Sequence, residues 1–230
     1  MSKQIAIVED EPAILGNYTD VLKRQGYAVK GYADRELALR DFRSKLPDLA
    51  ILDIGLGDDI DGGFELCREL RALSSTIPII FLTARDSELD TVSGLRLGAD
   101  DYLTKDISLA HLSARISTLF RRMQALQQPV QQERVLVRGD LRMDMERLQI
   151  SWMDQPVDLT VTEIWFVQAL ANHPGHVRTR EQLMDAANIL VDSSSISTHI
   201  KRIRRKFCAI DPEFDAIETI YGMGYRWNSN

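Results

Sequence analysis

Acidic, basic and hydroxyl side chains follow several short apolar runs in the first half of the chain. They are Glu9 and Asp10 after residues 5–8, Asp53 after 49–52, Thr83 after 79–82 and Lys105 after 101–104. If these runs are strands of one parallel sheet, their carboxyl ends meet at one edge, where such sheets bind ligands. Three carboxylates, a hydroxyl and an ammonium group at one edge suit a divalent cation and a phosphoryl group.

The chemistry of each side chain indicates a role. Asp53 is the candidate nucleophile, because a carboxylate can accept a phosphoryl group as an acyl phosphate. Attack by an anion on an anion needs charge neutralisation, which Mg²⁺ provides in phosphoryl transfer. The candidate metal ligands are Asp10, Asp53, the backbone carbonyl of Gly55 and, through water, Glu9. Lys105 is expected to pair with a phosphoryl oxygen, and the Thr83 hydroxyl to donate to another.

Alternating apolar runs and amphipathic helices predict an α/β domain. We expect strands at 5–8, 27–29, 49–52, 79–82 and 102–104, and helices at 12–25, 34–46, 64–73, 88–97 and 109–122. Five such repeats predict a doubly wound, three-layer parallel sheet with right-handed crossovers. Residues 1–122 are therefore expected to form the first domain.

Residues 123–134 are rich in glutamine and contain Pro129, which predicts a linker that starts as an extension of the preceding helix. The pattern then changes over residues 135–230. Short strands are expected at 135–137, 141–144, 148–152 and 157–158, and helices at 162–172, 180–187 and 194–208. A terminal hairpin is expected over 217–227. Strands, three helices and a hairpin predict an α+β winged helix.

The last of these helices combines an apolar stripe with a run of basic residues. Ile196, Ile200, Ile203 and Phe207 recur at helical spacing, and Lys201, Arg202, Arg204, Arg205 and Lys206 are all cationic. An apolar face opposite a basic face is what a helix in the major groove of DNA needs. The predicted DNA contacts are Ser194, Ser195, Thr198, His199, Lys201, Arg202 and Arg205. A solvated helix face or a site for an acidic partner is the alternative for the run taken alone.

The first domain resembles the receiver domain of two-component response regulators. The motifs that carry the resemblance are Val8-Glu9-Asp10-Glu11-Pro12, Leu52-Asp53, Leu82-Thr83-Ala84-Arg85 and Gly98-Ala99-Asp100-Asp101-Tyr102-Leu103-Thr104-Lys105. The resemblance implies a flavodoxin-like fold with strand order 2-1-3-4-5. It also implies phosphorylation of Asp53 by a sensor histidine kinase, with Thr83 and Tyr102 as switch residues whose movement repacks the surface.

The second domain resembles the DNA-binding domain of the OmpR/PhoB family. Leu159-Thr160-Val161-Thr162-Glu163, Arg180-Glu181-Gln182-Leu183, the segment 199–207 and Tyr221-Gly222-Met223-Gly224-Tyr225-Arg226-Trp227 carry this resemblance. It implies that the terminal hairpin is the wing, that Arg226 enters the minor groove, and that the loop 188–193 faces RNA polymerase. Segments 198–203 and 217–219 also resemble regulators paired with a proteobacterial dedicated sortase system.

Some positions depart from the family pattern. Asp106 replaces the usual proline after Lys105, so we expect a trans bond there, because a cis bond before a non-proline residue costs about 2.5–4 kcal/mol. The loop 54–64 is about two residues longer than usual and adds acidic residues. Family members dimerise through a surface whose predicted members here are Asp100, Asp101, Arg115 and Arg122. Ser93, Arg96 and His111 differ from the usual charged pairs, so the dimer is expected to be weaker or differently paired.

The composition limits the function classes. The net charge is −6, so DNA binding must rest on local charge. Cys67 and Cys208 form no metal-binding pattern, and no apolar run is long enough to span a bilayer, so we expect a cytoplasmic protein that does not bind membranes. We expect a regulator rather than an enzyme. An aspartyl phosphatase would need an Asp-x-Asp motif, and Gly55 stands at its second position. A regulator that works without phosphate is the remaining alternative.

Overall fold

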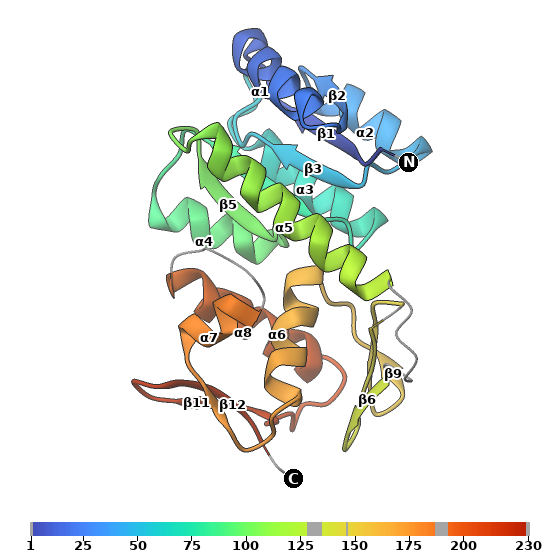
Figure 1. The fold of residues 1–230 in the computed structure, drawn as a ribbon, viewed down its shortest axis with the longest axis vertical. Helices are drawn as coiled ribbons and strands as arrows, with labels where there is room; N and C mark the ends of the chain where they lie inside the picture. The colour runs from blue at the N-terminus through green and yellow to red at the C-terminus, as the bar shows by residue number, and fades with distance from the viewer. Residues whose placement is uncertain (1, 128–134, 146, 187–192, 229–230) are drawn as a thin grey trace. The chain divides into compact units, whose positions relative to one another are not determined.

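The computed structural model describes residues 2–127, 135–145, 147–186 and 193–228 (Figure 1). The chain divides into two compact units, Met1–Ala114 and Arg115–Asn230. The division falls inside a long helix, and each unit is described below by itself. The domain boundaries at 122 and 134 remain predictions.

The first unit is a five-stranded parallel sheet with the order β2-β1-β3-β4-β5, as the resemblance implied. Its strands are β1 (Gln4–Val8), β2 (Ala28–Tyr32), β3 (Leu49–Leu52), β4 (Ile79–Thr83) and β5 (Asp101–Thr104). Its helices are α1 (Pro12–Arg24), α2 (Arg35–Ser44), α3 (Gly62–Leu73), α4 (Glu88–Leu97) and α5 (Leu109–Gln127). The bounds of β3 and α4 match the prediction, and the other elements differ from it by a few residues. Helix α5 continues to Gln127, in agreement with the prediction that the linker starts as an extension of this helix.

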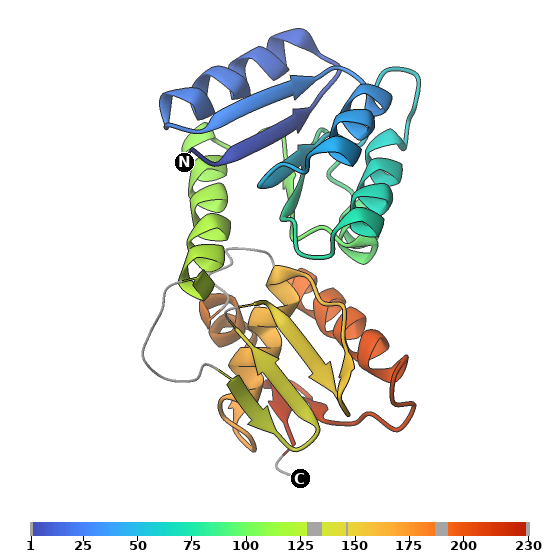
Figure 2. The same ribbon diagram turned by 90° about the vertical axis from the view of Figure 1, so that its right-hand side faces the viewer.

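Helices cover both faces of this sheet (Figure 2). Helices α2, α3 and α4 pack in succession on one face. On the other face, Gln25 at the end of α1 donates a hydrogen bond to Ser113 near the start of α5. Every residue of β3 and β4 is buried, because helices lie on both sides of these central strands. Strand β2 lies at the edge and is mostly exposed.

Local sequence signals fix several helix ends in this unit. Pro12 stands at the first helical position of α1, where its missing amide costs no hydrogen bond. The side chains of Asp34 and Ser87 accept hydrogen bonds from backbone amides in the first turns of α2 and α4. These caps set where the loops at the carboxyl edge of the sheet begin and end.

The second unit contains a four-stranded antiparallel sheet, three helices and a three-stranded sheet that includes the terminal hairpin. Its strands are β6 (Val135–Arg138), β7 (Leu141–Asp144), β8 (Gln149–Trp152), β9 (Gln155–Pro156), β10 (Val177–Arg178), β11 (Ile217–Ile220) and β12 (Gly224–Trp227). Its helices are α6 (Val161–Ala171), α7 (Arg180–Ala186) and α8 (Ser193–Cys208). This arrangement is the predicted winged helix.

Two details of the second unit differ from the sequence predictions. Strand β9 lies at Gln155–Pro156 rather than at 157–158, because a tight turn at Met153 and Asp154, both with positive φ, brings the chain back one step earlier. Strand β10 was not predicted, since a two-residue strand carries no periodic signal. It pairs with β12 and so joins the segment before α7 to the hairpin.

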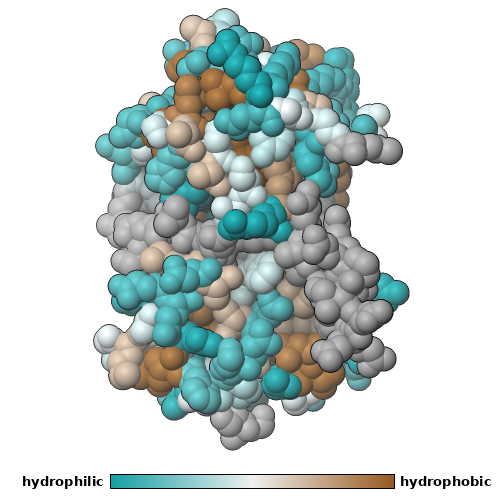
Figure 3. Space-filling model, viewed as in Figure 1, coloured by the Kyte–Doolittle hydropathy of each residue, from teal (hydrophilic) through white to brown (hydrophobic). Residues whose placement is uncertain are grey.

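The predicted apolar stripe of α8 is confirmed, because Ile196, Ile200, Ile203 and Phe207 are all buried in one core. That core also holds a cluster of rings, in which Phe207 stacks on Phe214 and Trp152 meets both at their edges. On the surface, apolar residues appear as separate patches among hydrophilic ones on the face drawn in Figure 3. Within the described residues, no helix is long and apolar enough to cross a membrane.

Candidate phosphoacceptor site and nucleic-acid interface

Three carboxylates meet at the carboxyl edge of the first sheet. Strands β1 and β3 are paired in register, with Val8 opposite Leu52, so the residues that follow them converge. Ligand oxygens of Glu9, Asp10 and Asp53 lie within 4.8 Å of one another. Glu9 and Asp53 are buried, whereas Asp10 is half-buried. This is the geometry that sequence reasoning predicted, and it gathers oxygen ligands of the kind that Mg²⁺ prefers.

Lys105 reaches into the acidic cluster from the end of β5. Its Nζ lies 2.7 Å from Oδ2 of Asp53 and 2.9 Å from Oε2 of Glu9. Burial alone would lower the pKa of Lys105, but the hydrogen bonds to both carboxylates outweigh this and raise it above its usual value. Burial raises the pKa of Glu9, which its hydrogen bond with Lys105 opposes. The lysine is thus held as a cation against the candidate nucleophile.

The two predicted switch residues meet at one backbone position. The Thr83 hydroxyl is buried and accepts a hydrogen bond from the Arg85 amide at 3.3 Å. The Tyr102 hydroxyl donates to the Arg85 carbonyl at 2.9 Å, and its ring lies near Phe81. Burial raises the pKa of Tyr102, so its phenol stays protonated and can donate this bond. The loop after β4 therefore connects the hydroxyl near the cluster to the aromatic ring.

The loop after β3 approaches the cluster through its backbone. Oδ1 of Asp53 accepts a hydrogen bond from the Ile54 amide, and Oδ2 of Asp10 accepts one from the Gly57 amide at 3.0 Å. A Cβ on Gly63 would lie 1.9 Å from the carbonyl oxygen of Asp53, so only glycine fits there. Sequence reasoning did not identify Gly63 or the Gly57 contact. Gly55 is half-buried beside Asp53, and its role as a metal ligand remains a prediction.

The segment after Lys105 behaves as predicted. The bond between Lys105 and Asp106 is trans. The Thr104 hydroxyl donates a hydrogen bond to the carboxylate of Asp106, which is exposed. Replacement of the usual proline therefore leaves Lys105 in contact with Asp53.

Asp100, a predicted member of the dimer surface, is bound inside the first unit. Its carboxylate accepts hydrogen bonds from Arg71 at 2.9 Å and from the Ile79 amide at 3.0 Å, and it is 2% exposed. It thus holds α3 against the sheet. Asp101 and Arg115 are also buried. The side chain of Arg122 lies outside the described residues, and the dimer surface remains a prediction.

The basic run of α8 divides into an inner and an outer set. Lys201 and Arg205 are exposed and lie one helical turn apart on the surface of the second unit. Arg204 instead donates to the carbonyl of Ile217 and the hydroxyl of Thr219 on β11. Arg202 and Lys206 pair with the buried carboxylate of Glu163. Only the outer pair is presented as a row of positive charge.

Glu163 is a buried carboxylate that links α6 to α8, a role that the sequence did not predict. It forms a capping box with Thr160 at the start of α6, a signal that the Thr-x-x-Glu spacing carries. One of its oxygens accepts from Arg202 and the other from Lys206 at 2.7 Å. Burial would raise the pKa of Glu163, but the two cations outweigh it and lower the pKa to about 2. Burial also lowers the pKa of Lys206, which Glu163 opposes.

Two of the predicted DNA contacts on α8 are buried in this structure, and their role at DNA remains a prediction. His199 is 0% exposed with its ring against Phe166, and Arg202 is 4% exposed on Glu163, so neither side chain is presented to DNA. Thr198 is largely buried as well. The side chains of Ser194 and Ser195 lie outside the described residues, as do residues 188–192 of the loop 188–193 that was predicted to face RNA polymerase. Arg226 on β12 is half-buried and paired with Glu218.

Comparison with known proteins identifies both units. Residues 5–117 match the response regulator receiver domain, and residues 154–227 match the C-terminal domain of transcriptional regulatory proteins. The chain belongs to the OmpR/PhoB family of response regulators. It is 40% identical to the transcriptional regulatory protein CreB of Escherichia coli (strain K12) over 223 residues, which are 95% of each chain. It is 38% identical to BaeR of Escherichia coli O6:H1, covering 99% of this chain and 93% of the relative.

Solved structures agree with this assignment. The response regulator DrrB of Thermotoga maritima, an OmpR/PhoB homologue, is 29% identical and is matched over 99% of this chain and all of its own, with a TM-score of 0.53. A RitR variant is 22% identical and is matched over the full length of both chains with a TM-score of 0.78, which shows a shared fold. The relatives are transcriptional regulators, so this chain is a regulator whose receiver controls a DNA-binding domain. The resemblance to regulators of dedicated sortase systems remains a prediction.

Proposed function

We propose that Asp53 is the phosphoacceptor and that its phosphorylation by a sensor histidine kinase drives binding of α8 and the wing to promoter DNA. The observation that carries the proposal is the contact of Lys105 with Asp53 inside a cluster of three carboxylates. In the transfer, an Asp53 oxygen forms a bond to phosphorus while the bond from phosphorus to the donor nitrogen of the kinase breaks, and the donor imidazole retains its proton.

The residues around Asp53 suit a divalent cation. Three carboxylates with oxygens inside 4.8 Å provide the negative charge and the oxygen ligands, and the cluster lies at a half-buried edge that water reaches through Asp10. Asp10, Asp53 and the Gly55 carbonyl would hold Mg²⁺ directly, and Glu9 through water. When bound, the cation neutralises the charge that builds up on the phosphoryl oxygens.

The chain's own residues then read the phosphoryl group. Lys105 is already placed beside Asp53 and pairs with a phosphoryl oxygen. The Thr83 hydroxyl, whose oxygen accepts from the Arg85 amide, keeps its own proton to donate to the phosphoryl group. Movement of Thr83 carries the Arg85 backbone with it and so shifts the acceptor of the Tyr102 hydroxyl. The switch thus passes from a charge at Asp53 to the packing of an aromatic ring.

For DNA, Lys201 and Arg205 are the phosphate-binding residues that the geometry favours, because they are exposed while the inner cations of α8 are engaged. Ser194, Ser195 and Arg226 complete the proposed contact. Phosphorylation would favour a homodimer that places two winged helices on repeated half-sites, with RNA polymerase as the further partner. The proposed location is the cytoplasm, and the proposed role is that of a regulator without enzymatic turnover.

The test is phosphorylation of the full chain with acetyl phosphate and Mg²⁺, followed by intact-mass measurement. The expected result is a gain of one phosphoryl group that is lost in Asp53→Ala and that strengthens binding to a promoter fragment. A mass gain that survives Asp53→Ala would place the acceptor elsewhere. DNA binding that is unchanged by phosphorylation would instead favour a regulator that works without phosphate.

A further inference from the structure

The loop after β3, residues 55–61, makes hydrogen bonds to other parts of the first unit at both of its ends. Its first part makes a tight turn, in which Leu56 and Asp59 exchange two backbone hydrogen bonds and Gly57 has a positive φ of 62°. That turn directs the Gly57 amide at Oδ2 of Asp10. One end of the loop therefore contacts a candidate metal ligand.

At its far end, the loop is bound by Arg85, which lies in the loop after β4. Its guanidinium donates to the carboxylate of Asp61 at 3.1 Å and to the carbonyl of Ile60 at 2.5 Å. It also lies 3.4 Å from Asp90 in the first turn of α4, which anchors it on a helix. Arg85 thus joins the acidic loop 55–61 to the loop that follows Thr83.

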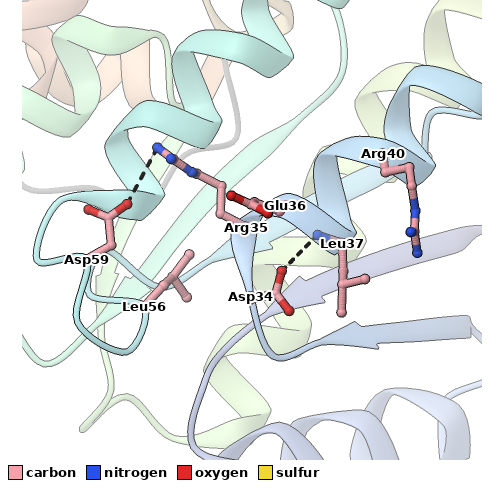
Figure 4. Close-up of a pocket in the computed structure, with 7 residues that line it drawn as sticks. All are labelled: Asp34, Arg35, Glu36, Leu37, Arg40, Leu56 and Asp59. Carbon is pink, nitrogen blue, oxygen red and sulfur yellow. Dashed lines mark hydrogen bonds and ion pairs between the residues drawn. The ribbon is translucent and has the colours of Figure 1, made fainter.

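A second arginine forms an ion pair with the middle of the loop. Arg35 of α2 lies 3.5 Å from the Asp59 carboxylate, and Figure 4 shows its guanidinium extended toward Asp59 across a pocket lined in part by Leu56. Arg35 also lies 3.3 Å from Glu65. Two arginines on separate elements therefore hold one loop, and Leu56, which is 7% exposed, fixes its turn to the core.

We propose that Arg85 is a positioning residue for the metal site, which latches loop 55–61 so that the Gly57 amide orients the Asp10 carboxylate for Mg²⁺. This rests on the proposed function of the acidic cluster. An amide held on Oδ2 of Asp10 leaves its other oxygen available to bind a cation, and outer partners of this kind contribute strongly to metal affinity. Arg85 acts on the cation through the loop and not by contact.

The positive charge of Arg85 allows the effect of loop position on Mg²⁺ binding to be distinguished from a direct effect of charge. Removing a nearby positive charge would by itself strengthen cation binding, whereas removing the negative charge of Asp61 would weaken it. The latch predicts the same sign for both changes, because each frees the loop. Arg85→Ala and Asp61→Asn should each weaken Mg²⁺ binding to the full chain, by about tenfold, in calorimetric titrations.

Hydrogen exchange on the metal-free full chain gives an independent readout. Backbone amides of residues 55–61 should exchange faster in Arg85→Ala and in Asp61→Asn than in the unchanged protein. Asp58→Asn is the matched control, because it removes the same charge from the same loop at an exposed residue for which no ion pair appears within the described residues. It should leave exchange unchanged and alter Mg²⁺ affinity only by its charge.

The outcomes separate cleanly. Tighter Mg²⁺ binding by Arg85→Ala, or loop exchange equal to that of the unchanged protein, would overturn the latch. Faster exchange with unchanged Mg²⁺ affinity would overturn the link to Asp10. Neither measurement uses a phosphoryl donor. The role of Arg85 is therefore tested independently of whether Asp53 accepts a phosphoryl group.

Discussion

Lys105 and Asp53 are joined by a contact of 2.7 Å between Nζ and Oδ2, and the same Nζ lies 2.9 Å from Glu9. The lysine balances two buried carboxylates before any ligand arrives. Its positive charge reduces the repulsion between the carboxylates and an anionic phosphoryl group.

Replacing Lys105 should slow phosphorylation of Asp53. Lys105→Met removes the cation but keeps much of the apolar stem, and a charged hydrogen bond contributes about 1.5–3 kcal/mol, so the rate should fall roughly 10- to 100-fold. The measurement is the time course of intact mass with acetyl phosphate and Mg²⁺. Circular dichroism on the same sample controls for folding. A rate equal to that of the unchanged protein would show that Lys105 does not assist the transfer.

The acidic site could be predicted because its residues follow apolar runs whose pairing order the fold fixes. Glu9, Asp53 and Lys105 needed only the rule that parallel strands share one carboxyl edge. The contact of Arg85 with loop 55–61 could not be predicted, because ion pairs between separate loops leave no periodic signal in the sequence. The ion pair of Arg202 could not be predicted for a related reason, because its partner Glu163 lies on another helix and only the packing of α6 against α8 brings them together.

Gly63→Ala should destabilise the first unit by about 1–3 kcal/mol, because its Cβ would collide with the Asp53 backbone, which cannot move without displacing the acidic cluster. Gly16→Ala is the matched control. No atom lies within 4 Å of a Cβ there, and alanine in a helix is favoured over glycine by about 1 kcal/mol. Thermal unfolding by circular dichroism should therefore shift downward for the first variant and upward for the second. Equal melting temperatures would contradict the close approach at Gly63.

The two sets of cations on α8 should differ in the salt dependence of DNA binding. Lys201→Ala and Arg205→Ala should each reduce the slope of log K against log salt by about 0.9, since each exposed cation releases counterions from one phosphate. Arg202→Met should leave the slope unchanged, because Arg202 is engaged with Glu163. Fluorescence anisotropy with a labelled duplex of arbitrary sequence measures the slope. A loss of slope in Arg202→Met would show that its side chain turns out to DNA.

Glu163 should make the second unit sensitive to acid. Its pKa is lowered from 4.5 to about 2 by Arg202 and Lys206, which outweigh burial, so the folded state binds its proton more weakly than the unfolded state. The resulting stability is present above pH 4.5 and is lost as the pH falls toward 2, by roughly 3 kcal/mol in all. The three tryptophans, Trp152, Trp165 and Trp227, all lie in this unit, so their fluorescence during urea unfolding of the full chain reports on it.

Glu163→Gln should remove this pH dependence while lowering stability at neutral pH by about 3–5 kcal/mol, because the buried Arg202 and the half-buried Lys206 would lose their carboxylate partner. Glu218→Gln is the matched control, since Glu218 pairs with Arg226 at a partly exposed site where an ion pair contributes about 0–1 kcal/mol. The control should keep the acid-dependent loss of the unchanged protein. An equal loss between pH 4.5 and 2 in Glu163→Gln would mean that another carboxyl group causes it, and that the contact between α6 and α8 does not depend on the Glu163 charge.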